Sequence, residues 1–305
     1  MALKTTNKLR FNKKNNIMKN YILKTSLILL IAFTCNTLFA QEETEQKEDK
    51  PVRGPWEAST LIESQTVIGS NAKQLELIIH HRMGSVENGF SDIFGIYGAS
   101  NIRMGLQYGI TDKLTIGIGT EKNNKFSDLN AKYAVFQQTR SGKIPVSLSV
   151  HANITYDARD EEVFGTNYEF MDRFSYFGQV IVSRKFTDAF SLQLAPSYSH
   201  FNSVDVKYQN DKAGVMLGGR YKFTGTMAAI FEYHQPININ PVHDYQDDIQ
   251  PGAAIGIEIG TSTHAFQIFA SNYKDIMAQK NYTMNTNKFD GEGILIGFNI
   301  SVRFN

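Results

Sequence analysis

Cysteine is almost absent from this chain, because Cys35 is its only cysteine in 305 residues. Cys35 lies in an N-terminal apolar segment, so a mature chain beginning after that segment has no disulfide, no thiolate nucleophile and no cysteine ligand for a metal. Proline, with seven residues, and tryptophan, with one, are also scarce. No apolar run has the length of a membrane-spanning helix, which excludes a helical membrane protein.

A strong charge of one sign is missing as well. The formal net charge is +1, but residues 1–40 carry seven Lys or Arg and no acid, which leaves 24 basic against 30 acidic residues. Without a basic surface, nucleic acid is not expected as a partner. Nucleotide loops, zinc-protease helices and the serine elbow of hydrolases are also missing. We therefore expect no cofactor and no metal, and predict that the protein is not an enzyme.

The N-terminus has the pattern of a secretory signal peptide. Lys19 and Lys24 flank the start of a short apolar run, and acidic residues follow Ala40. We predict a signal peptide over 1–40, cleaved after Ala40, with Met18 as a candidate true start and a long basic leader as the alternative. A lipoprotein acylated on Cys35 is a further alternative, although a threonine precedes it where a small residue is usual.

The remaining chain divides into a linker and a large domain. Residues 41–55 are rich in Glu, Gln and Lys and are predicted to be a disordered acidic linker. Residues 56–305 are predicted to form the barrel domain described below. Within it, residues 56–70 fit a strand, a plug segment or a periplasmic lead-in, and the sequence leaves these three open.

From residue 73 onward, apolar side chains alternate with small or polar ones, the period of a β-strand with two different faces. The pattern predicts twelve strands: 73–83, 100–110, 114–121, 127–138, 146–156, 174–186, 190–202, 213–223, 226–235, 252–260, 263–272 and 294–304. An even number of strands of about ten residues is typical of a closed, antiparallel transmembrane β-barrel. The fold class is therefore predicted to be all-β.

The connections between these strands alternate between tight and long. Tight turns are expected at 111–112, 141–145, 187–188, 224–225 and 261–262, and all but one of the intervening connections are long and polar. Outer-membrane barrels have short periplasmic turns and longer extracellular loops. We therefore predict the outer membrane of a Gram-negative cell, with both termini periplasmic and lipid around the barrel. A secreted soluble β-protein is the alternative, but it has no reason to place its long loops at one end.

Pro196 interrupts the seventh predicted strand. Proline cannot donate a hydrogen bond to a neighbouring strand, and a closed sheet has no free edge to hide this loss. A β-bulge is therefore expected at Pro196.

Ten charged side chains share the polar parity and are predicted to face the lumen, where they are candidates for setting selectivity. They are Glu76, Arg82, Arg103, Asp128, Lys132, Arg220, Lys222, Glu232, Glu258 and Arg303. Spread over opposite walls of a hydrated pore, they would create a transverse field for small polar solutes. Paired across the lumen, they would fill it. Twelve strands permit either arrangement, and small luminal residues such as Gly105 and Ser149 favour water.

Histidines are the other candidates for chemistry. His80 and His234 have luminal parity near the predicted extracellular rim, whereas His81 and His200 face outward. This split argues against a shared metal or haem site and favours rim histidines bonded to neighbours or water. A barrel-embedded hydrolase is the alternative function, and it would need His80 or His234 as its base beside a luminal Ser or Asp.

Two stretches resemble a known family. They are His80-His81-Arg82-Met83-Gly84 and the hairpin Tyr108-Gly109-Ile110-Thr111-Asp112-Lys113-Leu114-Thr115-Ile116-Gly117-Ile118-Gly119. Together they are similar to a family of uncharacterised β-barrel proteins from Bacteroidota, a domain of unknown function, with the resemblance running from about residue 56 to the end. It implies the envelope and the barrel fold but no mechanism.

The predicted function is passive. The chain is expected to be a porin-like outer-membrane barrel that either conducts small polar solutes or serves as an envelope scaffold for a protein partner that the sequence does not identify.

Overall fold

The computed structural model describes residues 49–239 and 248–304. The predicted signal peptide, with Met18, Cys35 and Ala40, lies outside the described residues. The chain divides into two units, 1–49 and 50–305, and every strand belongs to the second. None of the described helices is long and apolar enough to cross a membrane.

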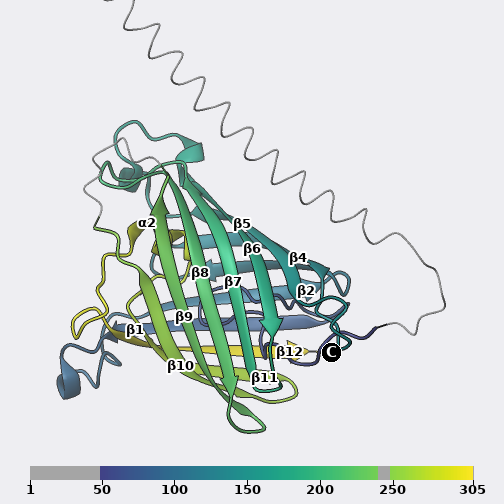
Figure 1. Cartoon of the computed structure of the whole chain (residues 1–305). Helices are drawn as coiled ribbons and strands as arrows, with labels where there is room; N and C mark the ends of the chain where they lie inside the picture. The colour runs from purple at the N-terminus through teal and green to yellow at the C-terminus, as the bar shows by residue number, and fades with distance from the viewer. Residues whose placement is uncertain (1–48, 240–247, 305) are drawn as a thin grey trace, which may run out of the picture. The chain divides into compact units, whose positions relative to one another are not determined.

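Twelve antiparallel strands close into one barrel, in which each strand pairs with its neighbours in sequence and β1 pairs with β12 (Figure 1). The strands are β1 (Leu75–Ser85), β2 (Asn101–Gly109), β3 (Leu114–Glu121), β4 (Phe126–Phe136), β5 (Ser147–Asp157), β6 (Phe174–Lys185), β7 (Phe190–Phe201), β8 (Asp211–Lys222), β9 (Met227–Asn238), β10 (Gly252–Gly260), β11 (His264–Ser271) and β12 (Leu295–Phe304). Each lies within three residues of its predicted range, so the predicted fold class and strand number are confirmed.

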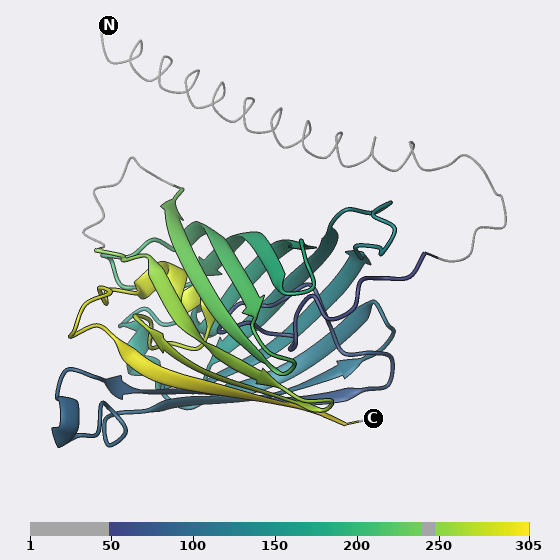
Figure 2. The same cartoon turned by 60° about the horizontal axis from the view of Figure 1, so that its bottom comes forward.

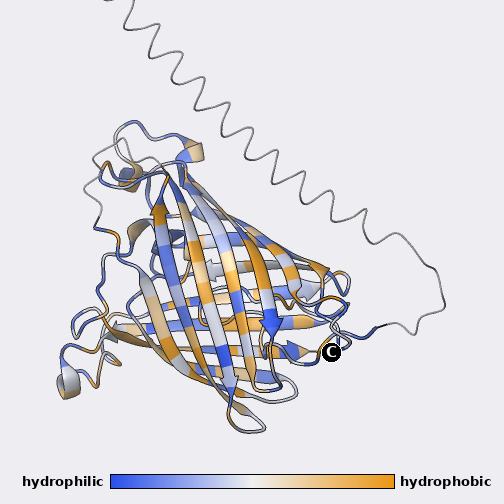
Figure 3. Ribbon diagram, in the orientation of Figure 1, coloured by the Kyte–Doolittle hydropathy of each residue, from blue (hydrophilic) through white to orange (hydrophobic). Residues whose placement is uncertain are grey.

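Alternation decides which side chains face inward. Along β5, Ser149, His151 and Asn153 are buried, whereas Val150 and Ile154 are exposed on the outer wall. Figure 3 shows the same banding of apolar and polar residues along the front strands. Because each of the twelve described strands has two neighbours, the barrel they form has no free edge, as a sheet surrounded by lipid requires.

The tight turns and long loops lie at opposite ends of the barrel. The connections 86–100, 122–125, 158–173, 202–210 and 272–294 join strands at one end, which also holds the end of β9 and the start of β10. We call it the long-loop end. Tight connections join strands at the other end, which holds Leu75, the first residue of β1, opposite Phe304 of β12. The predicted alternation therefore holds with one exception, because the connection between β4 and β5 runs over 137–146 and is longer than the tight turn expected at 141–145.

The bulge expected at Pro196 does not occur. Pro196 pairs with Val215 in a β7–β8 register that runs unbroken along the strands. On its other side, the paired positions of β6 and β7 stop at Gln179–Ser197 and resume at Val182–Leu194 in the same register. The proline is therefore accommodated by a local gap in the ladder, without an extra residue.

Residues 56–70 form neither a strand nor a lead-in, but a hairpin inside the lumen. The hairpin enters from the tight-turn end, and its two arms are joined by a bridge between Thr60 and Gln65. In Figure 2 this purple segment runs between the barrel walls. The hairpin returns to the same end, where the chain enters β1. We call residues 56–70 the luminal hairpin.

The described end of the predicted linker differs from the expectation of disorder. Pro51 forms a β-bridge with Thr139, and the amide of Val52 donates to the carbonyl of Gln138 at 2.9 Å. Lys185 donates to the carbonyl of Arg53 at 2.8 Å. Residues 50–53 are therefore attached to the tight turns around β4, β5 and β6.

A second segment enters from the long-loop end. The loop between β11 and β12 contains the short helix α2 (Ala278–Met284), whose Gln279, Tyr282 and Thr283 are buried. The Tyr282 ring packs directly against Gly214 on β8, and a Cβ at this position would clash with the ring. The lumen is thus occupied from both ends, which answers the open question between a hydrated and a filled barrel.

Candidate functional site

One side of the lumen carries an apolar cluster that packs against the luminal hairpin. Trp56, Leu61, Ile62 and Val67 of the hairpin are buried in a cluster with inward side chains of six successive strands. The wall residues of this cluster are Ile181, Ala195, Met216, Ile230, Ala254 and Phe269, on β6 to β11. Burial of this apolar area is what stabilises the hairpin in place. We call this side the dry wall.

A buried carboxylate fixes the tip of the hairpin to the dry wall. Glu232 on β9 accepts hydrogen bonds from the amides of Ile62, Glu63 and Ser64, each at 3.0 Å. The hydroxyl of Tyr273 donates to Glu232 at 3.1 Å, and His234 Nε2 lies 3.1 Å from the same oxygen. A carboxylate that accepts this many hydrogen bonds is held in one position, so Glu232 binds the turn of the hairpin specifically.

The opposite wall is hydrophilic, and its contacts with the hairpin are polar. Lys132 on β4 donates to the carbonyls of Ser59 at 2.8 Å and Ile68 at 2.6 Å. Ser149 on β5 donates to the carbonyl of Val67 at 2.7 Å. On β2 to β5, nearly all inward side chains are polar or absent. We call this side the wet wall.

Helix α2 meets both the wet wall and the hairpin. Gln279 donates to Thr155 at 2.9 Å and to Asn153 at 3.1 Å on β5. Asn281 donates to a carboxylate oxygen of Glu63 on the hairpin. The two luminal segments therefore touch at Glu63, in the middle of the barrel.

Glu63 is held in an environment that disfavours its charge. Burial raises its pKa to about 7, and the like charge of Glu232 acts in the same direction, against the lowering effects of His234, Arg82 and the bond from Asn281. Near neutral pH this carboxyl group is therefore partly protonated.

Three cavities lie in sequence along the wet wall. One of about 290 Å³ opens at the tight-turn end, one of about 40 Å³ lies mid-lumen, and one of about 460 Å³ lies beneath the long loops. The inward face of β5 borders all three, with Ser147 at the first, His151 and Asn153 at the second and Asp157 at the third. The contacts of Ser149 and of Gln279 fall between them.

The predicted luminal charges lie in the lumen but are largely paired. Eight of the ten are buried: Glu76, Arg82, Arg103, Asp128, Lys132, Arg220, Glu232 and Glu258. Lys222 and Arg303 are only half-buried at the tight-turn end. Arg103 and Asp128 form a bidentate ion pair with distances of 2.7 and 2.8 Å, and Arg220 lies 2.6 Å from Glu258.

Two further charges take part in the filling of the lumen. Arg82 donates to Asn299 at 3.1 Å and lies over the Phe269 ring at 4.6 Å. Glu57 of the hairpin lies 3.5 Å from both Arg220 and Arg303. The ion pairs among the predicted charges join strands that lie two apart in the barrel, β2 with β4 and β8 with β10, so these charges pair along the wall and not across the lumen. A role of these residues in selectivity stays a prediction.

The candidate histidines face as predicted but lie deeper. His80 and His234 are buried in the lumen, whereas His81 stacks on Phe298 and His200 lies 2.6 Å from Asp211. The prediction that His80 and His234 mark the rim is wrong, because β1 continues to Ser85 and β9 to Asn238.

The hydrolase alternative gains little from these positions. His234 Nδ1 lies 3.1 Å from the Tyr282 hydroxyl and its Nε2 contacts Glu232, so no serine is bonded to it. Among residues 49–239 and 248–304, no three His, Cys, Asp or Glu side chains come together as a metal site would require.

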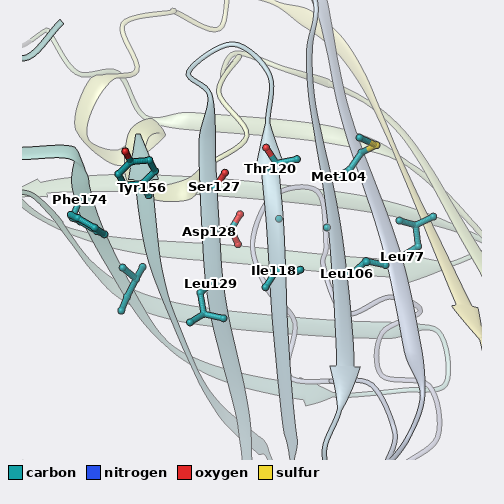
Figure 4. A pocket seen from close by; sticks show the side chains of 13 residues that line it. Leu77, Met104, Leu106, Ile118, Thr120, Ser127, Asp128, Leu129, Tyr156 and Phe174 are labelled. Carbon is teal, nitrogen blue, oxygen red and sulfur yellow. The ribbon is translucent and has the colours of Figure 1, made fainter. Parts of the chain in front are cut away.

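A large groove lies on the outer wall and reaches the luminal Asp128 at its base. It measures about 800 Å³ and lies over β1 to β6, and Leu106, Ile118 and Leu129 are prominent in its lining (Figure 4). Such a lining suits hydrocarbon, not polar chemistry.

The sequence placed Ser149 in the lumen but did not predict its contact with the hairpin, nor the contacts of Glu63 and Gln279 that also close the lumen. One signal was present, since residues 56–70 depart from the period of two that governs the chain after residue 73. Nothing comparable marks Gln279, whose loop resembles any long polar connection.

Comparison with known proteins agrees with this architecture. Residues 56–304 match the family model described as a membrane-bound β-barrel domain, DUF5777. The chain belongs to this family, and it is a membrane-bound β-barrel of the outer-membrane type. No curated protein matches it.

Solved structures of barrels are similar only at low identity. An outer-membrane channel from Pseudomonas putida F1 (COG4313) is 12% identical with a TM-score of 0.48, over 84% of this chain and 100% of that one. The KdgM porin is 8% identical with a TM-score of 0.48, over 75% and 99%. The NanC porin is 11% identical with a TM-score of 0.46, over 76% and 99%. These similarities do not indicate what this chain carries.

Proposed function

We propose that this protein is an outer-membrane channel for small polar solutes, closed at rest by the luminal hairpin and by helix α2. The single observation that carries the proposal is the row of three cavities along the inward face of β5. A barrel that served only as a scaffold would have no need to leave free space along one hydrophilic wall.

Two sets of hydrogen bonds separate the three cavities. Lys132 and Ser149 hold residues 67–68 of the hairpin between the first and the second cavity. Gln279 holds α2 against Asn153 and Thr155 between the second and the third. The neutral bonds of Ser149 and Gln279 can each be exchanged for a bond to water at a net cost of about 0.5–1.5 kcal/mol, and a bond from the Lys132 ammonium at about 1.5–3 kcal/mol. Closure on the wet wall is therefore reversible, while the dry wall keeps the hairpin anchored.

The membrane arrangement follows from the connections. The tight-turn end, with the start and end of the barrel, is assigned to the periplasm and the long-loop end to the exterior, as outer-membrane barrels are built. The apolar outer wall, including the groove in Figure 4, is assigned to lipid.

Swelling of proteoliposomes in small polar solutes tests the proposal. The refolded wild-type chain should give slow swelling. The double variant Ser149→Ala/Gln279→Ala should give several-fold faster swelling, because it weakens both sets of hydrogen bonds that separate the cavities. Ser127→Ala, whose side chain is exposed outside the barrel, is the matched control and should behave as the wild type. If the folded double variant swells no faster than empty vesicles, the channel proposal is wrong.

The scaffold function is the second candidate, and exposed apolar side chains on the long loops favour it. Phe90 is 87% exposed, Tyr97 74% and Val206 95%. Side chains of this kind are common in protein contacts. A scaffold predicts that the lumen stays closed in every folded variant, which the swelling assay distinguishes directly.

A further inference from the structure

The middle cavity on the wet wall is bordered by an unusual number of polar atoms that have no protein partner. They include both ring nitrogens of His80, Nδ1 of His151, both amide atoms of Gln179, the hydroxyl of Ser64 and Oε1 of Gln65. His80, His151 and Gln179 are each at least nine-tenths buried. Buried polar groups without partners are costly, so a cluster that shares one cavity calls for a polar occupant.

These atoms offer both kinds of hydrogen bond. The Gln179 nitrogen donates, the oxygens of Gln65 and Gln179 accept, and the two imidazoles and the Ser64 hydroxyl can do either. An occupant that satisfies them must itself carry donors and acceptors. Carboxylates supply only acceptors and ammonium ions only donors.

The charges around the cavity leave little net charge for an ion. Arg103 and Asp128, which both border it, are joined by a bidentate ion pair. Glu63 borders it too, and the pKa of about 7 leaves much of this group uncharged near neutral pH. An ion entering here would lose its hydration without gaining a counter-charge, which is expensive in a buried site.

The cavity is also small. Its volume of about 40 Å³ suits a few waters or a molecule of a few heavy atoms. We propose that this cavity, with His80, His151 and Gln179 as its binding groups, is a site for small uncharged solutes that carry both hydrogen-bond donors and acceptors, such as water and the smallest primary amides. The inference deepens the channel proposal and rests on it for its physiological meaning, but the site can be tested by itself.

Formamide and formate form a matched pair of probes, because they have the same number of heavy atoms but only formamide is uncharged and has N–H donors. The first measurement is ¹⁵N NMR of the histidine side chains in the full refolded chain, titrated with each probe. Formamide should shift the resonances of His80 and His151 saturably, and formate should not.

Variants identify the site. Gln179→Leu should weaken the formamide response several-fold, and Gln235→Leu, the same change on the exposed outer side of β9, should leave it intact. Ser64→Ala is a second variant on the hairpin, in case Gln179→Leu does not fold. Equal responses to formate and formamide, or a response unaffected in both folded cavity variants, would overturn the assignment.

Swelling in formamide separates this inference from the function on which it rests. Saturable NMR shifts without formamide uptake by the Ser149→Ala/Gln279→Ala variant would support the site and contradict the channel. Uptake without any histidine shift would support the channel and contradict the site.

Discussion

The two walls of the lumen hold the same hairpin by different physics. The dry wall packs apolar side chains against Trp56, Leu61 and Ile62, in addition to the hydrogen bonds that Glu232 accepts and that Gln193 and Gln267 donate. The wet wall contacts residues 59–68 through hydrogen bonds from Lys132 and Ser149, without such an apolar cluster. Apolar packing has no substitute in water, but water can replace a hydrogen-bond partner. One segment can therefore be anchored on one side of the lumen and released on the other.

The largest effect is expected at Glu232. Glu232→Ala leaves three hairpin amides and the Tyr273 hydroxyl without their acceptor in a dry environment. The free energy of unfolding should fall by about 3–5 kcal/mol, the usual cost of removing one partner of a buried charged contact. Urea unfolding of the refolded chain in vesicles measures it. Glu232→Gln, which keeps an acceptor oxygen, should recover part of the loss, and equal losses in both variants would contradict the role of the bonds.

Packing on the dry wall comes next. Ile62 is fully buried, and Ile62→Ala should lower the free energy of unfolding by about 2–5 kcal/mol, because it removes apolar contacts and leaves a cavity. The same unfolding assay applies. Ile118→Ala, with Ile118 58% exposed on the outer wall, should cost clearly less. Similar losses would mean that the dry wall is no better packed than the outer surface.

Glu63, where the hairpin meets α2, should make the free energy of unfolding depend on pH. Burial holds its pKa at about 7, above the ordinary value of 4.5, so between these values the folded chain keeps a proton that the unfolded chain has released. The free energy of unfolding should therefore fall as pH rises from 4.5 to about 7, by up to about 3 kcal/mol, since one pKa unit is worth about 1.4 kcal/mol. Glu63→Gln should flatten this slope in the same assay, and an unchanged slope would assign it to other groups.

The smallest effect on stability is expected on the wet wall. Ser149→Ala removes the hydrogen bond to the Val67 carbonyl and should cost about 1 kcal/mol, since Val67 borders the cavity at the tight-turn end, from which water can reach the freed carbonyl. Unfolding and hydrogen exchange of the hairpin amides measure it, and exchange should accelerate more than global stability falls. If Ser149→Ala lowered the free energy of unfolding as much as Ile62→Ala, the two walls would not differ in how strongly they hold the hairpin.

The parts of this protein that the sequence predicts are those that depend on local alternation. In a strand of about ten residues, a period of two is enough to predict which side chains face inward. This pattern placed Lys132 of 127–138 and His151 of 146–156 in the lumen without information on neighbouring strands. The order of tight and long connections likewise predicts the closed antiparallel topology. Small errors at strand ends were enough to misplace His80 and His234 at the rim.

The filling of the lumen was decided only by the tertiary structure. Glu232 and Ile62 are 170 residues apart, and Gln279 and Asn153 are 126 apart, so no local pattern links them. The sequence determined that a barrel forms and which side chains line it, because each strand sorts its faces independently. Whether the luminal charges border a pore or pair against a plug depended on which segments fold inward, and that is fixed by packing and hydrogen bonds between distant residues.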